Sequence, residues 1–383
     1  MSSLPAPIIK KYVNMFSVPL WAGLLTLPFA GIGNAISMAA AAGVVMVLWK
    51  LSRTEAANEF SRTLVQKLSS LNAVSSILAK YAYAPATLAG TVVLLFILPV
   101  FLNDYYRDIM TLTGLYIVLA LGLNVIVGQA GLLNLGYVAF YAIGAYTYAI
   151  LSTVYGLAFW PGLVAGTLCA AGFAVLLGLP ILRLRGDYFA IVTLGLGEIT
   201  RIILNNWNSM TNGPNGISNI PRPVIEGYTL HTTFDFYYLI LLIVIISVFT
   251  VYRLMLSRIG RAWIAIREDE IAAEAMGINT LRLKLLAFVL GSAWAGLAGV
   301  FFAAKMAFVA PESFTFFESV LILCMVVLGG MGSIPGIILG ALLLITLPEI
   351  FRDFQDYRML AFGLALVLMM VFRPQGLLGT VKK

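Results

Sequence analysis

The sequence predicts an all-α fold, a polytopic membrane helix bundle of about ten to twelve spans with broken or re-entrant helices. Hydrophobic residues make up 61% of the chain and charged residues 11%. The mean hydropathy of +0.97 lies far from the values of water-soluble domains. Several apolar runs approach or exceed the ~20 residues that a helix needs to cross a bilayer. These runs lack the apolar and polar alternation of barrel strands, which leaves helices as the spanning structure.

The expected spans follow from the apolar runs and from the turn signals between them. They cover approximately residues 17–33, 34–50, 84–102, 109–128, 130–153, 160–182, 187–206, 236–256, 285–306, 318–332, 335–348 and 359–373. The first two alternatively form one long tilted helix, because the stretch from Gly31 to Asn34 is the only turn signal between them. The two spans on either side of Gly329–Ser333 are short, and we expect them to form a broken or re-entrant hairpin.

The first 80 residues predict an N-terminal membrane-spanning extension with a cytoplasmic helical linker. Lys10 and Lys11 precede an apolar run that has no persuasive cleavage site, so we expect this first span to be retained. Residues 51–80 interleave charged residues with Ser and Ala and contain few strong apolar anchors. The main membrane domain is therefore expected over residues 81–383.

Glycines cluster between two expected spans, in the run from Gly128 to Gly136. Such glycines let helices approach closely, and they also break helices so that backbone groups face a polar substrate. The candidates for lining a substrate path or packing helices are Gly128, Gln129, Gly131, Asn134 and Gly136. The sequence has no G-x-x-x-x-G-K-[ST] phosphate loop, so an ATP-driven process would need its ATPase on another polypeptide.

Glu198 and Arg201 are three residues apart within the expected span 187–206. Charged side chains are costly in lipid, so both are expected to face protein or water, or to pair with each other. They fit two roles, lining a substrate path or holding helices together. Lys305 and Glu318 bracket an exterior loop, and we expect them at the membrane interface rather than inside the membrane.

The longest exterior loop is expected over residues 206–235. Three prolines and two glycines between Thr211 and Pro223 predict rigid turns. A rigid, weakly charged loop suits docking of another protein, although a passive connector fits the pattern equally well. The candidate docking residues are Gly213, Pro214, Asn215 and Gly216.

The polar segment from Ser257 to Lys284 interrupts the apolar sequence. Its centre predicts a short helix of about seven residues, with Asp269 as N-cap and Gly277 as the stop. One arc of this helix is apolar, and Glu270 and Glu274 lie opposite. A short helix with a smooth apolar face is shaped to lie in a groove of another protein; the alternative is a solvated loop with a chance helix. The candidate residues are Asp269, Glu270, Ile271, Ala272, Ala273, Ala275, Met276 and Gly277.

Placing this polar segment in the cytoplasm puts most of the 24 basic residues on the inner side, with both termini cytoplasmic. The net charge of +7 therefore reflects membrane topology, and no basic patch with interleaved aromatics indicates nucleic-acid binding. Cys169 and Cys324 fall in apolar spans without a CxxC pattern, so we expect buried small hydrophobes. His231 is the only histidine and is expected at the surface, so no metal site is predicted.

Seven motifs in a fixed order carry a family resemblance. They are G-L-N-V-I-V-G-Q-A-G-L-L-N-L-G-Y-V-A-F-Y-A-I-G-A-Y (Gly122–Tyr146), L-R-L-R-G-D-Y-F-A-I-V-T-L-G (Leu182–Gly195), G-P-N-G-I-S (Gly213–Ser218), G-R-A-W-x-A-x-R-E-D-E-I-A (Gly260–Ala272), P-E-S-F-T-F-x-E-S (Pro311–Ser319), V-V-L-G-G-M-G-S (Val326–Ser333) and R-P-Q-G-L-L (Arg373–Leu378). With these motifs the chain resembles the membrane permease subunit of the high-affinity branched-chain amino acid ABC importers, in its longer, M-type form. The resemblance covers residues 84–380. The importer signature E-A-A-x-x-x-G, aligned on Gly277, has Ile271 here in place of its glutamate.

The resemblance implies that residues 81–383 form an ABC importer transmembrane permease domain in the bacterial inner (cytoplasmic) membrane. Such a domain moves leucine, isoleucine and valine from periplasm to cytoplasm. The implied partners are a shorter paralogous permease, two cytoplasmic ATPases coupled through residues 257–284, and a periplasmic amino acid-binding protein. ATP and Mg would bind to the partner ATPases, so this chain is expected to hold no cofactor and to catalyse no covalent reaction.

Two alternatives remain open at this stage. Related permeases of the same superfamily carry urea or short amides and differ little in these glycine motifs. An ion-coupled secondary amino acid transporter would also be a helix bundle, but it ordinarily needs intramembrane acidic residues, for which Glu198 is the candidate. A channel would need a ring-forming polar motif, which the sequence lacks.

Overall fold

The computed structural model describes residues 94–182, 184, 186–225, 227–350, 363 and 376–377. The chain divides into two compact units, Met1–Val74 and Ser75–Lys383, and every described residue belongs to the second. The expected N-terminal extension and its two spans lie outside the described residues, as does the last expected span apart from residue 363.

The described part is almost entirely helical, with four two-residue strands. Its elements are α4 (Asp104–Asn124), the π-helix η1 (Val125–Gln129), α5 (Val138–Tyr155), α6 (Phe159–Ile181), α7 (Asp187–Asn206), α8 (Asn208–Thr211), the 3₁₀ helix η2 (Gly213–Asn215), β1 (Ile217–Ser218), β2 (Val224–Ile225), β3 (Tyr228–Thr229), α9 (Thr233–Leu256), α10 (Arg258–Glu268), α11 (Glu270–Ala275), α12 (Thr280–Met306), β4 (Phe308–Val309), the 3₁₀ helix η3 (Pro311–Ser313), α13 (Phe316–Gly329) and α14 (Ile334–Ile350).

Six segments in this part of the chain are long and apolar enough to cross a membrane. They are Asp104–Gln129, Val138–Tyr155, Phe159–Ile181, Thr233–Leu256, Thr280–Met306 and Pro311–Gly329. The predicted polytopic membrane bundle is thereby confirmed. The expected total of ten to twelve spans also counts segments outside the described residues, the shorter apolar helix α14, and α7, which coincides with the expected span 187–206.

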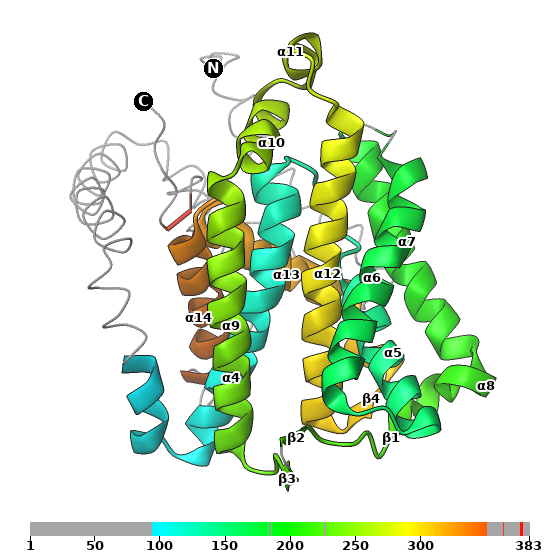
Figure 1. Cartoon of the computed structure of the whole chain (residues 1–383), viewed down its shortest axis with the longest axis vertical. Coiled ribbons are helices and arrows are strands. Elements are labelled where there is room, and N and C mark those ends of the chain that lie inside the picture. The colour runs from blue at the N-terminus through cyan, green and yellow to red at the C-terminus, as the bar shows by residue number, and fades with distance from the viewer. Residues whose placement is uncertain are drawn as a thin grey trace, which may run out of the picture. The chain divides into compact units, whose positions relative to one another are not determined.

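Helix α12 lies at the centre of the packing. It contacts α5 and α6 on one side and α4 on the other, and α4 in turn packs against α9, α13 and α14 (Figure 1). The crossing of α5 and α12 is tight, because a Cβ atom on Gly144 would overlap the carbonyl oxygen of Gly296. Small residues at such crossings let backbones approach in a membrane, where apolar side chains gain little by leaving lipid.

Two breaks interrupt the helical order. Helix α4 continues into η1, and residues 130–137 are then non-helical until α5 begins at Val138. The second break separates α13 from α14, where Gly330 and Gly332 have φ values of 107° and 88°. Glycine adopts such angles without strain, so the expected break between two apolar helices is present around Gly329–Ser333.

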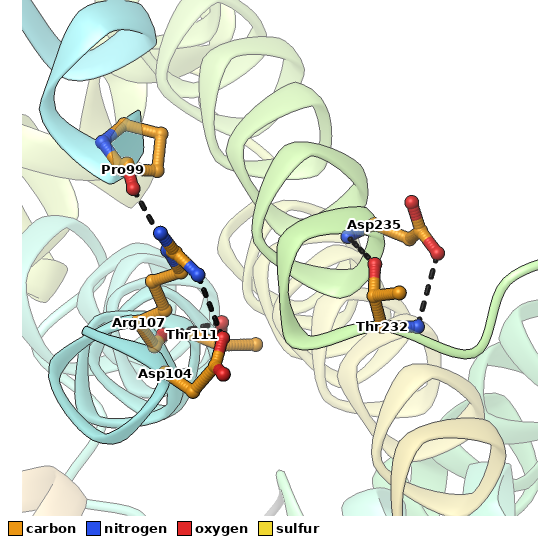
Figure 2. A network of polar contacts seen from close by, with 6 residues as sticks. All are labelled: Pro99, Asp104, Arg107, Thr111, Thr232 and Asp235. Carbon is orange, nitrogen blue, oxygen red and sulfur yellow. Dashed lines mark hydrogen bonds and ion pairs between the residues drawn. The ribbon is translucent and has the colours of Figure 1, made fainter. Parts of the chain in front are cut away.

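Arg107 connects the start of α4 with the start of α9 through a cation–π contact. Arg107 Nη1 donates to the Asp104 carboxylate at 2.6 Å (Figure 2), and its guanidinium carbon lies 4.5 Å from the centroid of the Phe234 ring. Helix α9 begins with a capping box, in which Thr232 Oγ1 accepts from Asp235 N and the Asp235 carboxylate accepts from Thr232 N (Figure 2). This box starts α9 three residues before the expected boundary at 236.

The strands lie at the end of the bundle opposite α11 (Figure 1). β1 pairs antiparallel with β4, and β2 pairs antiparallel with β3. The β1–β4 pair connects the expected exterior loop with the segment that follows α12.

The expectation that Cys169 is buried was wrong, because its side chain is exposed on α6. Only 28% of the most apolar stretch of α6 is buried in the described chain, so this helix turns much of its apolar surface outward. An apolar span is compatible with contact to lipid and with contact to protein, and the sequence does not distinguish between them. Cys324 is partly buried, and both thiols are free.

Candidate coupling site and substrate path

The short helix predicted within the polar segment is present as α11 (Glu270–Ala275). Asp269 is its N-cap, and its Oδ1 accepts from Ile271 N at 2.9 Å and from Ala272 N at 3.0 Å. These two bonds satisfy amides that would otherwise lack a partner in the first turn. Gly277, with φ of 84°, lies just after the helix.

The expected apolar arc of α11 is exposed. Ile271 is 72% and Met276 83% exposed, and Ala272 and Ala275 are exposed between them. Ala273 differs from the other candidates, since it is only 5% exposed and packs against its own chain. The exposed apolar arc therefore consists of Ile271, Ala272, Ala275 and Met276. Ala273 packs the helix against the rest of the chain.

An ion pair ties α11 to the central helix. Lys284 Nζ of α12 lies 2.6 Å from the Glu270 carboxylate, and the lysine side chain is only 9% exposed. Glu274 is exposed on α11. Both residues of the ion pair lie in the polar segment, but their contact does not follow from their spacing in the sequence.

Helix α10 (Arg258–Glu268) is a second helix of the polar segment and is not among the predicted elements. Ser257 is its N-cap and accepts from Gly260 N at 3.2 Å, while Trp263 and Ile266 face the core. Trp263 Nε1 also donates to Leu283 O at 2.7 Å, which fixes α10 against the start of α12. The signal available was the three-residue spacing of these buried positions behind a serine cap.

Arg267, at the end of α10, connects the polar segment with the glycine-rich run. Its Nη1 donates to the carbonyl of Gly128 in η1. Its side chain also packs closely on Gly131, whose φ is 72°. Two candidate regions far apart in the sequence therefore meet at this junction.

The α13–α14 turn joins the same junction. Asn124 Oδ1, fully buried at the end of α4, accepts from Gly332 N at 2.8 Å. A Cβ atom on Gly128 would overlap this amide oxygen and crowd Gly332 N. Gly128 thus has a packing role, and the neighbouring Gln129 is buried, with 2% exposure.

The non-helical residues 130–137 pack against α7. Asn134 Oδ1 accepts from Gly136 N at 3.0 Å, and Thr193 Oγ1 accepts from Leu135 N at 3.1 Å. A Cβ atom on Gly136 would overlap the carbonyl oxygen of Thr193, so Gly136 also packs helices. Leu133 points outward at 41% exposure, which leaves one edge of this interrupted segment open.

Glu198 and Arg201 form the expected pair on α7. Arg201 Nη2 lies 2.9 Å from Glu198 Oε2, and the two side chains are 36% and 33% exposed. The exposed residues Ile199 and Ile202 flank them. The pair lies on the outer face of α7, and among the described residues no hydrogen bond or ion pair joins it to the junction at Arg267.

The four candidate docking residues divide into two kinds. Pro214 and Asn215 are exposed, whereas Gly213 and Gly216 are buried within the loop. Gly216 lies so close to the Val309 carbonyl that a Cβ atom would overlap it. The loop lies with the strands, at the end of the bundle opposite α11 (Figure 1).

Glu318 lies beside the middle of α4, deeper in the bundle than the expected interfacial position. Tyr116 OH donates to Glu318 Oε2 at 2.7 Å, and Tyr116 lies midway along the 26-residue span Asp104–Gln129. Lys305 is nearer the end of the bundle, where its Nζ lies 2.9 Å from Asp108 Oδ1 in the first turns of α4. Lys305 and Glu318 lie on either side of one expected loop. The sequence does not reveal that residues 310–315 return toward the middle of the bundle, and this return places the two residues at different depths.

These features define a multi-pass helical membrane protein with an interrupted, glycine-packed core and an exposed polar-segment helix. Residues 105–372 match the family described as branched-chain amino acid transport system / permease component. The chain belongs to this family, which confirms the resemblance read from its motifs.

Relatives agree with this assignment. The chain is 52% identical over 294 residues to the high-affinity branched-chain amino acid transport system permease protein LivM of Escherichia coli K12, covering 71% of this chain and 69% of LivM. It is 28% identical to the permease protein BraD of Pseudomonas aeruginosa, covering 70% and 93%. It is also 28% identical to the permease protein LivH of Escherichia coli K12, covering 73% and 96%. No solved structure matches.

Proposed function

We propose that this chain is the transmembrane permease subunit of an ATP-binding cassette importer that moves branched-chain amino acids from periplasm to cytoplasm. The names of its relatives LivM and LivH support the substrate class and the pairing of two permeases. The complex would lie in the bacterial inner membrane with both chain termini in the cytoplasm. Urea or short amides are the alternative substrates within the same superfamily.

The observation that carries the proposal is the exposed apolar arc of α11. Ile271 and Met276 are 72% and 83% exposed on a polar loop. Exposing large apolar side chains to water is unfavourable, so such a patch indicates a surface that a partner covers. An ATPase with a matching groove is the partner that the family assignment favours. Closure of the ATPases on ATP would then move α11 and bias the permease between two membrane states.

Two contacts give this movement a route into the membrane. The Glu270–Lys284 ion pair links α11 to α12, and the Arg267–Gly128 hydrogen bond links α10 to the π-helix beside the interrupted segment. π-Helical turns are rare and are frequently found at functional sites. The substrate path would therefore pass beside residues 130–137, where the backbone leaves the helix.

The opposite end of the bundle would receive the substrate. Pro214 and Asn215 are exposed on a loop in which the neighbouring Gly216 lies close to β4. A fixed, weakly charged loop suits docking of a periplasmic amino acid-binding protein. ATP and Mg would be bound by two cytoplasmic ATPase subunits, and this chain would contribute no cofactor site.

The test of this assignment is the behaviour of the chain with and without its partners. Purified alone in detergent, the chain is expected neither to bind nor to hydrolyse ATP, because it lacks a phosphate loop. Co-expressed with the paired permease and the ATPases, it is expected to co-purify with them and to support ATP hydrolysis. Hydrolysis by the isolated chain, or substrate uptake by it driven by an ion gradient, would contradict the proposal.

A further inference from the structure

We propose that Glu318 and Tyr116 form an ammonium-binding position midway across the membrane, where the amino group of the transported amino acid binds during its passage. This inference rests on the proposed function, because it takes the substrate to be a zwitterionic amino acid. It goes further in naming the residues that bind the charged group.

The depth of the carboxylate is the first argument. Asp108, near the start of α4, pairs with Lys305, whereas Tyr116 binds Glu318 eight residues further along the same helix. Eight residues of α-helix correspond to roughly 12 Å. Glu318 therefore lies deep in the apolar part of the bundle, where an ionised carboxylate is costly and marks a substrate or ion path.

The contacts of Glu318 are the second argument. The sequence from Thr315 to Glu318 has the pattern of a capping box, yet α13 has no side-chain cap bond. The carboxylate turns instead to the hydroxyl of Tyr116. Among the described residues no basic side chain forms an ion pair with it, so its charge has no permanent counter-ion within this part of the chain.

The surroundings of Glu318 combine polar groups with aromatic side chains. Ser319, the next residue, accepts from Val138 N at 3.0 Å, which places Glu318 where the interrupted segment rejoins α5. The ring centroids of Tyr141 in α5 and Phe314, four residues before Glu318, are 5.0 Å apart. A few polar groups beside aromatic walls are typical of small-molecule sites.

Partial exposure argues that the position remains open to a ligand. Glu318 and Tyr116 are both half-buried, whereas their neighbours Leu115 and Ser319 are buried. The neutral Tyr116 hydroxyl keeps the Glu318 carboxylate oriented when no cation is bound. A transported cation has to leave again, so the site needs such a neutral partner. A fixed ion pair with a basic residue of the partner permease is the competing assignment, and the experiment separates the two.

The experiment uses the full complex of this chain with the paired permease and the ATPases, reconstituted in vesicles with the binding protein at saturation. For Glu318→Gln we expect normal recovery of all subunits and normal stimulation of ATP hydrolysis by the binding protein. Leucine uptake per ATP hydrolysed should fall about tenfold or more, because an amide does not neutralise an ammonium group.

Tyr116→Phe keeps the Glu318 carboxylate and should show a smaller loss of uptake. Glu312→Gln, an exposed acidic residue of η3, is the matched control and should transport normally.

A binding measurement identifies the charged group. Radiolabelled leucine bound to the complex without the binding protein should be displaced by leucinol, which has the amine only, and much less by 4-methylpentanoate, which has the carboxylate only. Glu318→Gln should abolish the displacement by leucinol. Unchanged uptake by Glu318→Gln would overturn the inference, and loss of the paired permease from the variant complex would assign the carboxylate to a subunit contact instead. A wild-type complex without ATP-driven leucine uptake would contradict the proposed function itself.

Discussion

Arg267 is a single residue through which the polar segment reaches the interior of the bundle. It bonds the Gly128 carbonyl of η1 and packs on Gly131, which belongs to the non-helical residues 130–137 that follow η1. Hydrogen bonds from charged donors are stronger than neutral ones, and a buried carbonyl without its donor is destabilised. The arginine is thus placed to transmit movement of α10 to the break in α4.

Substitution of Arg267 by Ala is expected to leave the complex assembled but to lower ATP-driven uptake roughly tenfold or more, given that such a bond contributes about 1.5–3 kcal/mol. Lysine at this position should restore only part of the rate, because it lacks the planar guanidinium group. Uptake in vesicles is the measurement. Arg258→Ala, at an exposed position on the same helix, is the control, and equal uptake by Arg267→Ala and this control would count against the link.

The pair formed by Glu198 and Arg201 tests a second residue-scale claim. Glu198→Ala should lower the amount of assembled complex more than Glu198→Gln does, because glutamine still accepts a hydrogen bond from Arg201. Each side chain is about one-third exposed, so the difference should be modest. Complex recovery from membranes is the measurement. Equal and normal recovery of both variants would contradict a structural role for the pair, and an intact complex without transport would assign it to the path.

At the scale of elements, α11 is a six-residue helix that is too short to be stable by itself in water. Its cap at Asp269, the buried Ala273 and the Glu270–Lys284 ion pair hold it on the chain. These contacts leave the opposite arc free and fixed in orientation. A preformed helix of this kind loses little conformational entropy when it enters a groove.

Ala272→Arg and Ala275→Arg are expected to weaken ATPase docking while the spans remain folded. A groove packed against methyl groups accommodates neither the volume nor the unpaired charge of arginine. The cost should be a few kcal/mol, on the order of a 100-fold loss in affinity or more. Glu274→Gln, at an exposed position off the apolar arc, should cost far less. Pull-down of the ATPases with each variant is the measurement, and normal docking by both arginine variants would show that this helix does not enter a groove.

At the scale of the whole molecule, the described helices hold two unlike surfaces apart. The exposed apolar arc of α11 lies at one end, and the loop with Pro214 and Asn215 lies at the other (Figure 1). Between them run the glycine-packed helices, the interrupted segment and the mid-span carboxylate of Glu318. This arrangement fits the proposed importer, with one surface for each proposed soluble partner and a membrane-spanning part for the substrate.

Much of this arrangement follows from the sequence, because apolar length and glycine or aspartate signals are local properties. Local sequence properties predict the spans, α11 with its cap, the ion pair on α7 and the short α13–α14 hairpin. The junction at Arg267, the Glu270–Lys284 ion pair and the depth of Glu318 depend on contacts between distant segments. Cys169 was misplaced for a related reason, since its apolar span is equally compatible with lipid and with a protein core.

The most direct test of the proposed function is uptake by vesicles that contain the complete complex, with the amino acid-binding protein outside and ATP inside. Leucine, isoleucine and valine are expected to accumulate only when ATP, the binding protein and this chain are all present, and urea is expected not to accumulate. Accumulation that needs no ATP, or accumulation of urea in place of the branched-chain amino acids, would contradict the account.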